Sequence, residues 1–129
     1  MAPSRFTQDT TTISPSRTNA RAILTAVAVL FTTSCAETNA LIGDHQNAAY
    51  NYRTTAQALE KDAKKERDLQ NHIVAAMKLI DASKSRIASA EEYQKLGNPV
   101  WTKNMFEKSS VDLDAAANEI RATQEAQAH

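Results

Sequence analysis

Apolar and small residues recur at helical spacing over the second half of the chain. A first stripe alternates steps of four and three residues, at Leu69, Ile73, Ala76, Ile80, Ser83, Ile87 and Ala90. A second stripe has similar spacing, at Phe106, Ser109, Leu113, Ala117 and Ile120. Because such steps keep side chains on one face of an α-helix, the pattern predicts two amphipathic helices.

The segment Gly97-Asn98-Pro99 separates the two stripes. Glycine suits the left-handed position that follows a helix, and proline cannot continue a helix but is well placed to begin one. Asn98 or Thr102 can cap the second helix. The arms on either side, 69–96 and 101–128, have equal lengths. We therefore predict an antiparallel helical hairpin that turns at 97–99.

An earlier helix is predicted to begin at Asp44, whose carboxylate can accept the free amides of a first helical turn. Its stripe is interrupted by the charged run 61–68, which contains no glycine or proline. A continuous helix through that run is the simpler interpretation. The segment 44–68 either packs as a third helix or extends as a stalk. The expected fold of residues 44–128 is all-α, a helical hairpin or small three-helix bundle, partly coiled-coil-like.

The largest apolar residues of the two arms repeat every seven positions, at Ile73, Ile80 and Ile87 and again at Leu113 and Ile120. In an antiparallel pair that turns at residue 98, Ile87 would face Leu113 and Ile80 would face residues 117–120. We expect these residues to form the core of the hairpin.

Composition is consistent with one small helical domain. The chain has 129 residues, with only two glycines, three prolines and one cysteine. Its formal charge is zero, and from Cys35 onward it carries 12 basic and 14 acidic residues. No concentrated basic surface is expected, so nucleic acid is not an expected partner.

The stretch before that cysteine has the layout of a secretory signal. Arg17 and Arg21 precede the apolar run 22–31, and small residues lead to Cys35. The run is too short to cross a bilayer as a helix, which needs about 20 apolar residues. Residues 1–34 are therefore expected to be a removed signal peptide.

The residues Thr32-Thr33-Ser34-Cys35 resemble the lipobox of bacterial lipoproteins, although Thr32 stands where that family has an aliphatic residue. The resemblance implies cleavage before Cys35 and a diacylglycerol on its sulfur, with 35–43 as a lipidated tether. Ala36, rather than an aspartate, implies the periplasmic face of the outer membrane. The membrane would then be one partner, reached through the lipid.

Two other interpretations of the N-terminal region remain open. Ordinary signal peptidase could cut after Ala36 or Ala40, which would secrete the protein to the periplasm. Residues 1–21, with three arginines, many hydroxyl side chains and one acid, also have the composition of an organellar transit peptide.

No arrangement of residues predicts catalysis or a bound cofactor. Asp68 and His72, like Glu125 and His129, are four residues apart, whereas helical di-metal proteins use Glu-x-x-His. The chain has no Gly-x-Ser-x-Gly motif and no glycine-rich phosphate loop,. We therefore expect no catalytic residues, no metal ligands and no cofactor, and we do not expect an enzyme.

A cluster near the predicted turn is the candidate partner-docking patch, formed by Tyr93, Val100, Trp101, Met105 and Phe106. Exposed rings of this kind mark docking surfaces. The alternative is that they simply cover a small core. A stalk would hold this tip away from the membrane.

These observations predict a lipid-anchored envelope protein with a structural or protein-interaction role, for example as an accessory to a secretion, conjugation or exclusion system. Its protein partner would be an envelope component or a second copy of itself. The alternative is a soluble periplasmic helical bundle that binds a metal ion or a small ligand.

Overall fold

The computed structural model describes residues 35–128 and contains three long helices. They are α2 (His45–Asp68), α3 (His72–Lys95) and α4 (Pro99–Ala128), and residues 35–41 are helical as well. No strand occurs among the described residues. The predicted all-α fold is confirmed.

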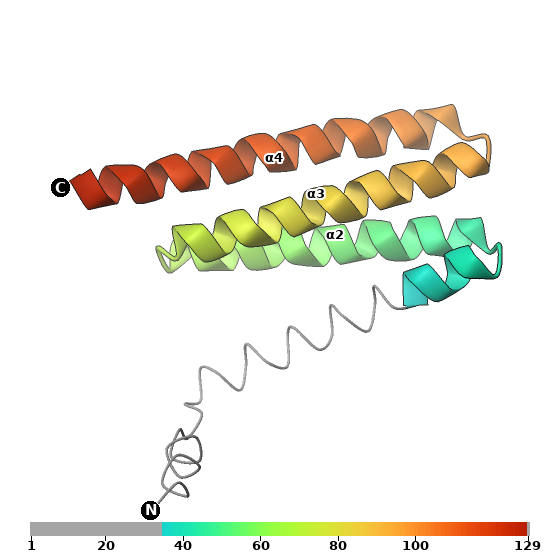
Figure 1. Ribbon diagram of the computed structural model, residues 1–129, viewed down its shortest axis with the longest axis horizontal. Coiled ribbons are helices and arrows are strands. Elements are labelled where there is room, and N and C mark those ends of the chain that lie inside the picture. The colour runs from blue at the N-terminus through green and yellow to red at the C-terminus, as the bar shows by residue number, and fades with distance from the viewer. Residues whose placement is uncertain (1–34, 129) are drawn as a thin grey trace, which may run out of the picture.

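Successive helices run antiparallel, and α3 lies between the other two (Figure 1). It packs along both α2 and α4, whereas α2 and α4 barely touch each other. The segment 44–68 therefore packs back as a helix and is not a stalk. The result is an open array of three helices, in which only neighbours in sequence share extensive interfaces.

The three chain reversals of this region share one geometry. A left-handed residue occupies positions 43, 70 and 97, spaced by 27 residues, with φ of 81° at Gly43, 62° at Gln70 and 69° at Gly97. In each turn the amide after that residue bonds to the carbonyl five positions earlier. This is the bond that closes a helix in a Schellman motif.

The residue after the left-handed position begins the next helix. Asp44 accepts a hydrogen bond from the amide of Asn47, and Asn98 accepts one from the amide of Trp101. The predicted cap at Asp44 and the predicted turn at Gly97-Asn98-Pro99 are confirmed. Asn98 is the cap of α4, and Thr102 is not.

The helix continues through the charged run 61–68, as expected, but the prediction that it joins the segment from Leu69 onward is wrong. The helix α2 ends at Asp68, and Gln70 adopts the left-handed conformation without being a glycine. Leu69-Gln70-Asn71 thus forms the same turn as Leu96-Gly97-Asn98. These helices form a short tandem array, in which each unit contacts only its neighbours, and this explains why the bundle stays open.

The core is built mainly from alanine. One cluster contains Ala63, Ala76, Leu79 and Ala116, a second Ala49, Ala90, Tyr93 and Met105, and a third Ala56, Leu59 and Ala82. Small side chains let the helix backbones approach closely but bury little apolar area each.

The predicted core of seven-residue stripes is wrong. Ile73, Ile87, Leu113 and Ile120 are between 36 and 50% exposed, and Ile80 packs only at the edge of one alanine cluster. The physical reason is that α3 has two neighbours rather than one. Its buried face is centred between them, on small residues, and the isoleucines fall to one side.

Cys35 lies at the same end of the array as the α3–α4 turn. Residues 36–43, expected to be a tether, are helical as far as residue 41, and Ala36 is fully buried. This short helix (cyan in Figure 1) runs to the turn that starts α2, beside the end of α3. The tip is therefore not held away from Cys35, as a stalk would have required.

The repeated turns allow a paired test of the left-handed position. A side chain there costs about 1 kcal/mol, and a Cβ built on Gly97 would meet no atom within 4 Å. Gly97→Ala should therefore lower the free energy of unfolding by about 1 kcal/mol, and Gln70→Gly should raise it by up to about that amount. Urea melts measure both. Destabilisation by Gln70→Gly would contradict the turn geometry.

Candidate functional site

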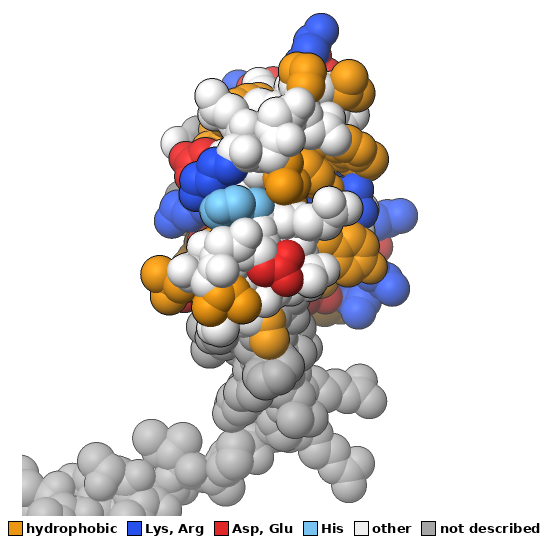
Figure 2. All heavy atoms as spheres, turned by 90° about the vertical axis from the view of Figure 1, so that its right-hand side faces the viewer, with side chains coloured by type: hydrophobic (Ala, Val, Ile, Leu, Met, Phe, Trp, Pro, Cys, Tyr) orange, Lys and Arg blue, Asp and Glu red, His pale blue; other side chains and the backbone are white. Residues whose placement is uncertain are grey.

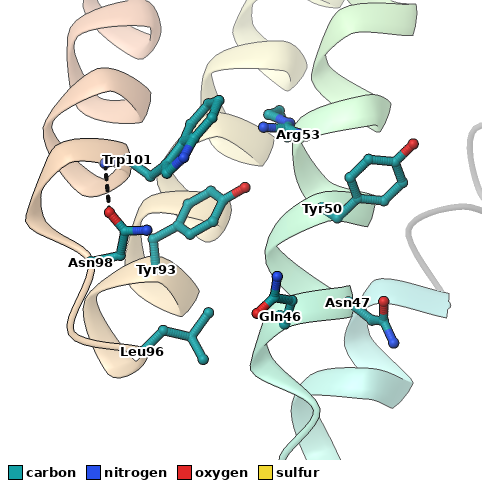
Figure 3. A pocket seen from close by; sticks show the side chains of 8 residues that line it. All are labelled: Gln46, Asn47, Tyr50, Arg53, Tyr93, Leu96, Asn98 and Trp101. Atoms are coloured by element: carbon teal, nitrogen blue, oxygen red, sulfur yellow. Dashed lines mark hydrogen bonds between the residues drawn. The ribbon is translucent and has the colours of Figure 1, made fainter.

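An open pocket of about 590 Å³ lies at the end of the array that bears the α3–α4 turn. All three helices contribute to it, because the repeated turns bring the starts of α2 and α4 beside the end of α3 (Figure 3). The lining residues are Gln46, Asn47, Tyr50, Arg53, Tyr93, Leu96, Asn98 and Trp101.

The pocket places a guanidinium group among aromatic rings. The rings of Tyr93 and Trp101 are stacked, with centroids 5.5 Å apart. The Arg53 guanidinium carbon lies 4.6 Å from the centroid of Trp101 and 5.3 Å from that of Tyr50. Among the described residues, no carboxylate pairs with Arg53. A stacked guanidinium keeps its N–H edge free, which suits a planar or tetrahedral oxyanion.

The structure divides the predicted docking patch. Tyr93 and Trp101 meet in the pocket, whereas Met105 is fully buried in the core. Val100 is 75% exposed at the turn, and Phe106 lines a second hollow, which also includes Pro99 and Lys103 and meets the first only at Asn98. The five residues therefore do not form one surface.

Sequence reasoning missed Tyr50 and Arg53, since both belong to α2, whose packing was left open. Their spacing of three residues puts them on one helix face, which is the only local signal. Nothing in the sequence of α2 indicates that this face meets Trp101.

A buried polar cluster joins all three helices near the middle of the array. Arg86 is 2% exposed and donates three hydrogen bonds to the carboxylate of Glu60, at 2.8 to 3.0 Å. Asp112 of α4 is also buried, and its Oδ2 has no hydrogen-bond partner among the described residues. Burial and the neighbouring Glu60 carboxylate raise the pKa of Asp112 to about 7.

Two histidine–glutamate pairs connect adjacent helices. His45 Nδ1 lies 2.5 Å from Glu92, and His72 Nδ1 lies 2.7 Å from Glu119. Although burial opposes it, hydrogen bonds from Lys95 and His45 lower the pKa of Glu92. Both pairs join residues 47 positions apart, because the 27-residue repeat places equivalent side chains in equivalent positions.

These pairs differ from those considered on sequence grounds. His72 contacts Glu119 and not Asp68, while His129 lies outside the described residues. Within residues 35–128, no group of three histidine, cysteine, aspartate or glutamate side chains could hold a metal ion. The polar clusters are contacts between the helices themselves.

Cys35 is a half-buried free thiol at the start of the described chain, and the expected signal peptide lies outside it. In this part of the chain, no helix is long and apolar enough to span a bilayer.

No protein-family model, curated protein or solved structure matches the chain.

The raised pKa of Asp112 predicts a pH-dependent stability. An unfolded aspartate titrates near pH 4, whereas the folded group titrates at about 7. The folded chain thus holds a proton that the unfolded chain loses, so this contribution is full below pH 4 and falls as pH rises towards 7. At pH 8, Asp112→Asn should have a free energy of unfolding higher than that of wild type by on the order of 1–3 kcal/mol. Urea melts measure this difference.

The difference between the two proteins should shrink towards pH 4, where the wild-type carboxyl is neutral. Asp114→Asn, on the exposed side of the same helix, is the control and should change stability little. An Asp112→Asn variant that is less stable than wild type at pH 8 would contradict the raised pKa of Asp112.

Proposed function

We propose that this protein is a lipid-anchored component of the bacterial cell envelope that works through protein–protein contact and not through catalysis. The signal-like segment ending at Cys35 supports the anchor,. An exposed apolar face on α3 and α4 supports the contact role and is the observation that carries it. The sorting pattern after the cysteine favours the periplasmic face of the outer membrane.

The apolar face comprises Ile73, Ile80 and Ile87 on α3 and Phe106, Leu113 and Ile120 on α4. On α3 it lies away from Arg86 and Ser89, the residues that bond to α2,. On α4, Leu113 points about 100° away from Asp112, the buried residue that faces Glu60,. Both stripes therefore flank the α3–α4 seam on the side that α2 leaves uncovered.

A second copy of the chain is the occupant that this face fits. Seven-residue spacing of large apolar residues on paired helices is the pattern of coiled-coil packing. Two such faces related by a two-fold axis would form an antiparallel four-helix arrangement, in which each copy presents the same surface. The exposed side chains of Ile73, Ile87, Leu113 and Ile120 would then be buried.

Mass analysis tests the anchor. Protein extracted from membranes should have a mass above that of the bare polypeptide 35–129, because the sulfur of Cys35 carries lipid. Cys35→Ser should remain unprocessed and lack that added mass. A mature N-terminus at Glu37 or Leu41 would contradict the anchor and indicate plain secretion.

Sedimentation velocity tests the contact, with the mature chain carrying Cys35→Ser. Leu113→Asp should weaken self-association by roughly ten-fold or more, equivalent to at least about 1.4 kcal/mol, because it places a charge in the apolar face. Val111→Asp is the matched control, since Val111 is 64% exposed on another side of α4 and its substitution should leave the dimer intact. A wild-type chain that stays monomeric at high micromolar concentration would refute the second copy as occupant.

A further inference from the structure

We infer that the end of the helix array carrying Cys35 lies directly on a lipid bilayer, with the apolar turn residues among the acyl chains and the Arg53 pocket at the level of the headgroup phosphates. The inference rests on the proposed lipid anchor for bringing this end to a membrane. It assigns a second, non-covalent membrane contact and an orientation to the protein.

The most exposed large apolar side chains of the described region gather at this end. Leu41 is 88% exposed, Val100 75% and Ile42 72%. They flank two turns that share this end of the array (Figure 1). Figure 2 looks onto it and shows hydrophobic side chains at several places, with a few acidic, basic and histidine side chains between them. No helix of the array covers them, and their exposure to water is unfavourable.

The pocket between these turns carries the side chains that suit a bilayer interface. Tyr50 and Trp101 are 52 and 38% exposed, and rings of these two types favour the headgroup layer. The Arg53 guanidinium lies over both rings and has no carboxylate partner among residues 35–128. A headgroup phosphate is an oxyanion that its free N–H edge can bind.

The opposite end is less suited to lipid. Its turn exposes Leu69, at 69%, but it follows directly on the charged run 61–68, whose desolvation would oppose insertion. The pocket beside it is lined by no tyrosine or tryptophan. It is also separated from the Cys35 end by the length of α3, 24 residues, or roughly 36 Å at 1.5 Å per residue,.

Charge attraction is not the basis of the contact. Glu37 of the short helix and Asp44 of the first turn are acidic residues of this end, and Glu92 pairs with His45 and Lys95. Apolar insertion therefore outweighs attraction to anionic lipid, and zwitterionic vesicles should suffice.

Trp101 is the only tryptophan of the chain and reports directly on this contact. Membrane-extracted protein would be reconstituted into phosphatidylcholine vesicles that contain lipids brominated on the acyl chains. The emission of Trp101 should shift to shorter wavelength and lose much of its intensity. A paired variant, Trp101→Phe with Val74→Trp, moves the probe to the far end of α3, where Val74 is 41% exposed, and should not be quenched.

A triple variant, Leu41→Asp, Ile42→Asp and Val100→Asp, tests the inserted side chains. It should keep its lipid and stay with the vesicles, but the quenching of Trp101 should be lost. Circular dichroism checks that it remains helical. Quenching that the triple substitution leaves unchanged would overturn the inference, as would equal quenching of the probes at positions 101 and 74.

The outcome is separable from that of the proposed function. Lipid-modified protein whose Trp101 is not quenched would retain the anchor and overturn the orientation. If mass analysis finds no lipid, the proposed anchor is wrong, but the membrane contact can still be tested by mixing the same vesicles with the unmodified mature chain. Quenching of Trp101 would then support the contact, and its absence would overturn it. A blue shift that appears without vesicles as the dimer forms would also overturn it, since a second copy would then cover this end.

Discussion

The reversal of the chain every 27 residues is the constraint on which the rest of the structure depends. A left-handed residue followed by an aspartate or asparagine closes one helix and opens the next at three positions. Because α2 and α3 have the same length, 24 residues each, their ends align. That alignment produces the equivalent histidine–glutamate pairs, and it brings Arg53 of α2 within stacking distance of Trp101 of α4.

The helix interfaces that these turns create bury little apolar area, and polar groups strengthen them. Alanine faces give close approach but little buried area, and hydrogen bonds between helices add to them. Ser83 bonds to Ser109 and Ser89 bonds to the carbonyl of Ala49. Arg86, held by Glu60, reaches the sulfur of Met105 at 3.6 Å. Removing one member of such a buried network leaves its partner without compensation, so the network favours this one arrangement of the three helices.

Sequence reasoning predicted the parts of the fold that depend on backbone chemistry. The cap at Asp44 and the turn at Gly97-Asn98-Pro99 follow from local preferences, and helical spacing predicted the helices. The turn at Gln70 escaped prediction because glutamine rarely adopts positive φ, although its neighbours Leu69 and Asn71 match Leu96 and Asn98 in the later turn. A search for recurrences at a fixed period would have found it.

The position of the core and half of the candidate site could not be predicted in the same way. A stripe of isoleucines indicates a face that avoids water, but it does not say whether that face meets a helix of the same chain. The answer depended on α3 having two neighbours. Tyr93 and Trp101 were placed in the candidate site from the sequence because adjoining helices carry them. Tyr50 and Arg53 were not, because they belong to α2.

The antiparallel order of the helices also determines the direction in which the chain points. Three long helices follow the short one that begins at Cys35, and an odd number of reversing units carries the chain to the opposite end of the array (Figure 1). The helix α4 has 30 residues and spans roughly 45 Å,. A segment fused after Ala128 would accordingly be displayed about that far from the end that carries Cys35. Inserting or deleting a single 27-residue unit would move that segment to the Cys35 end.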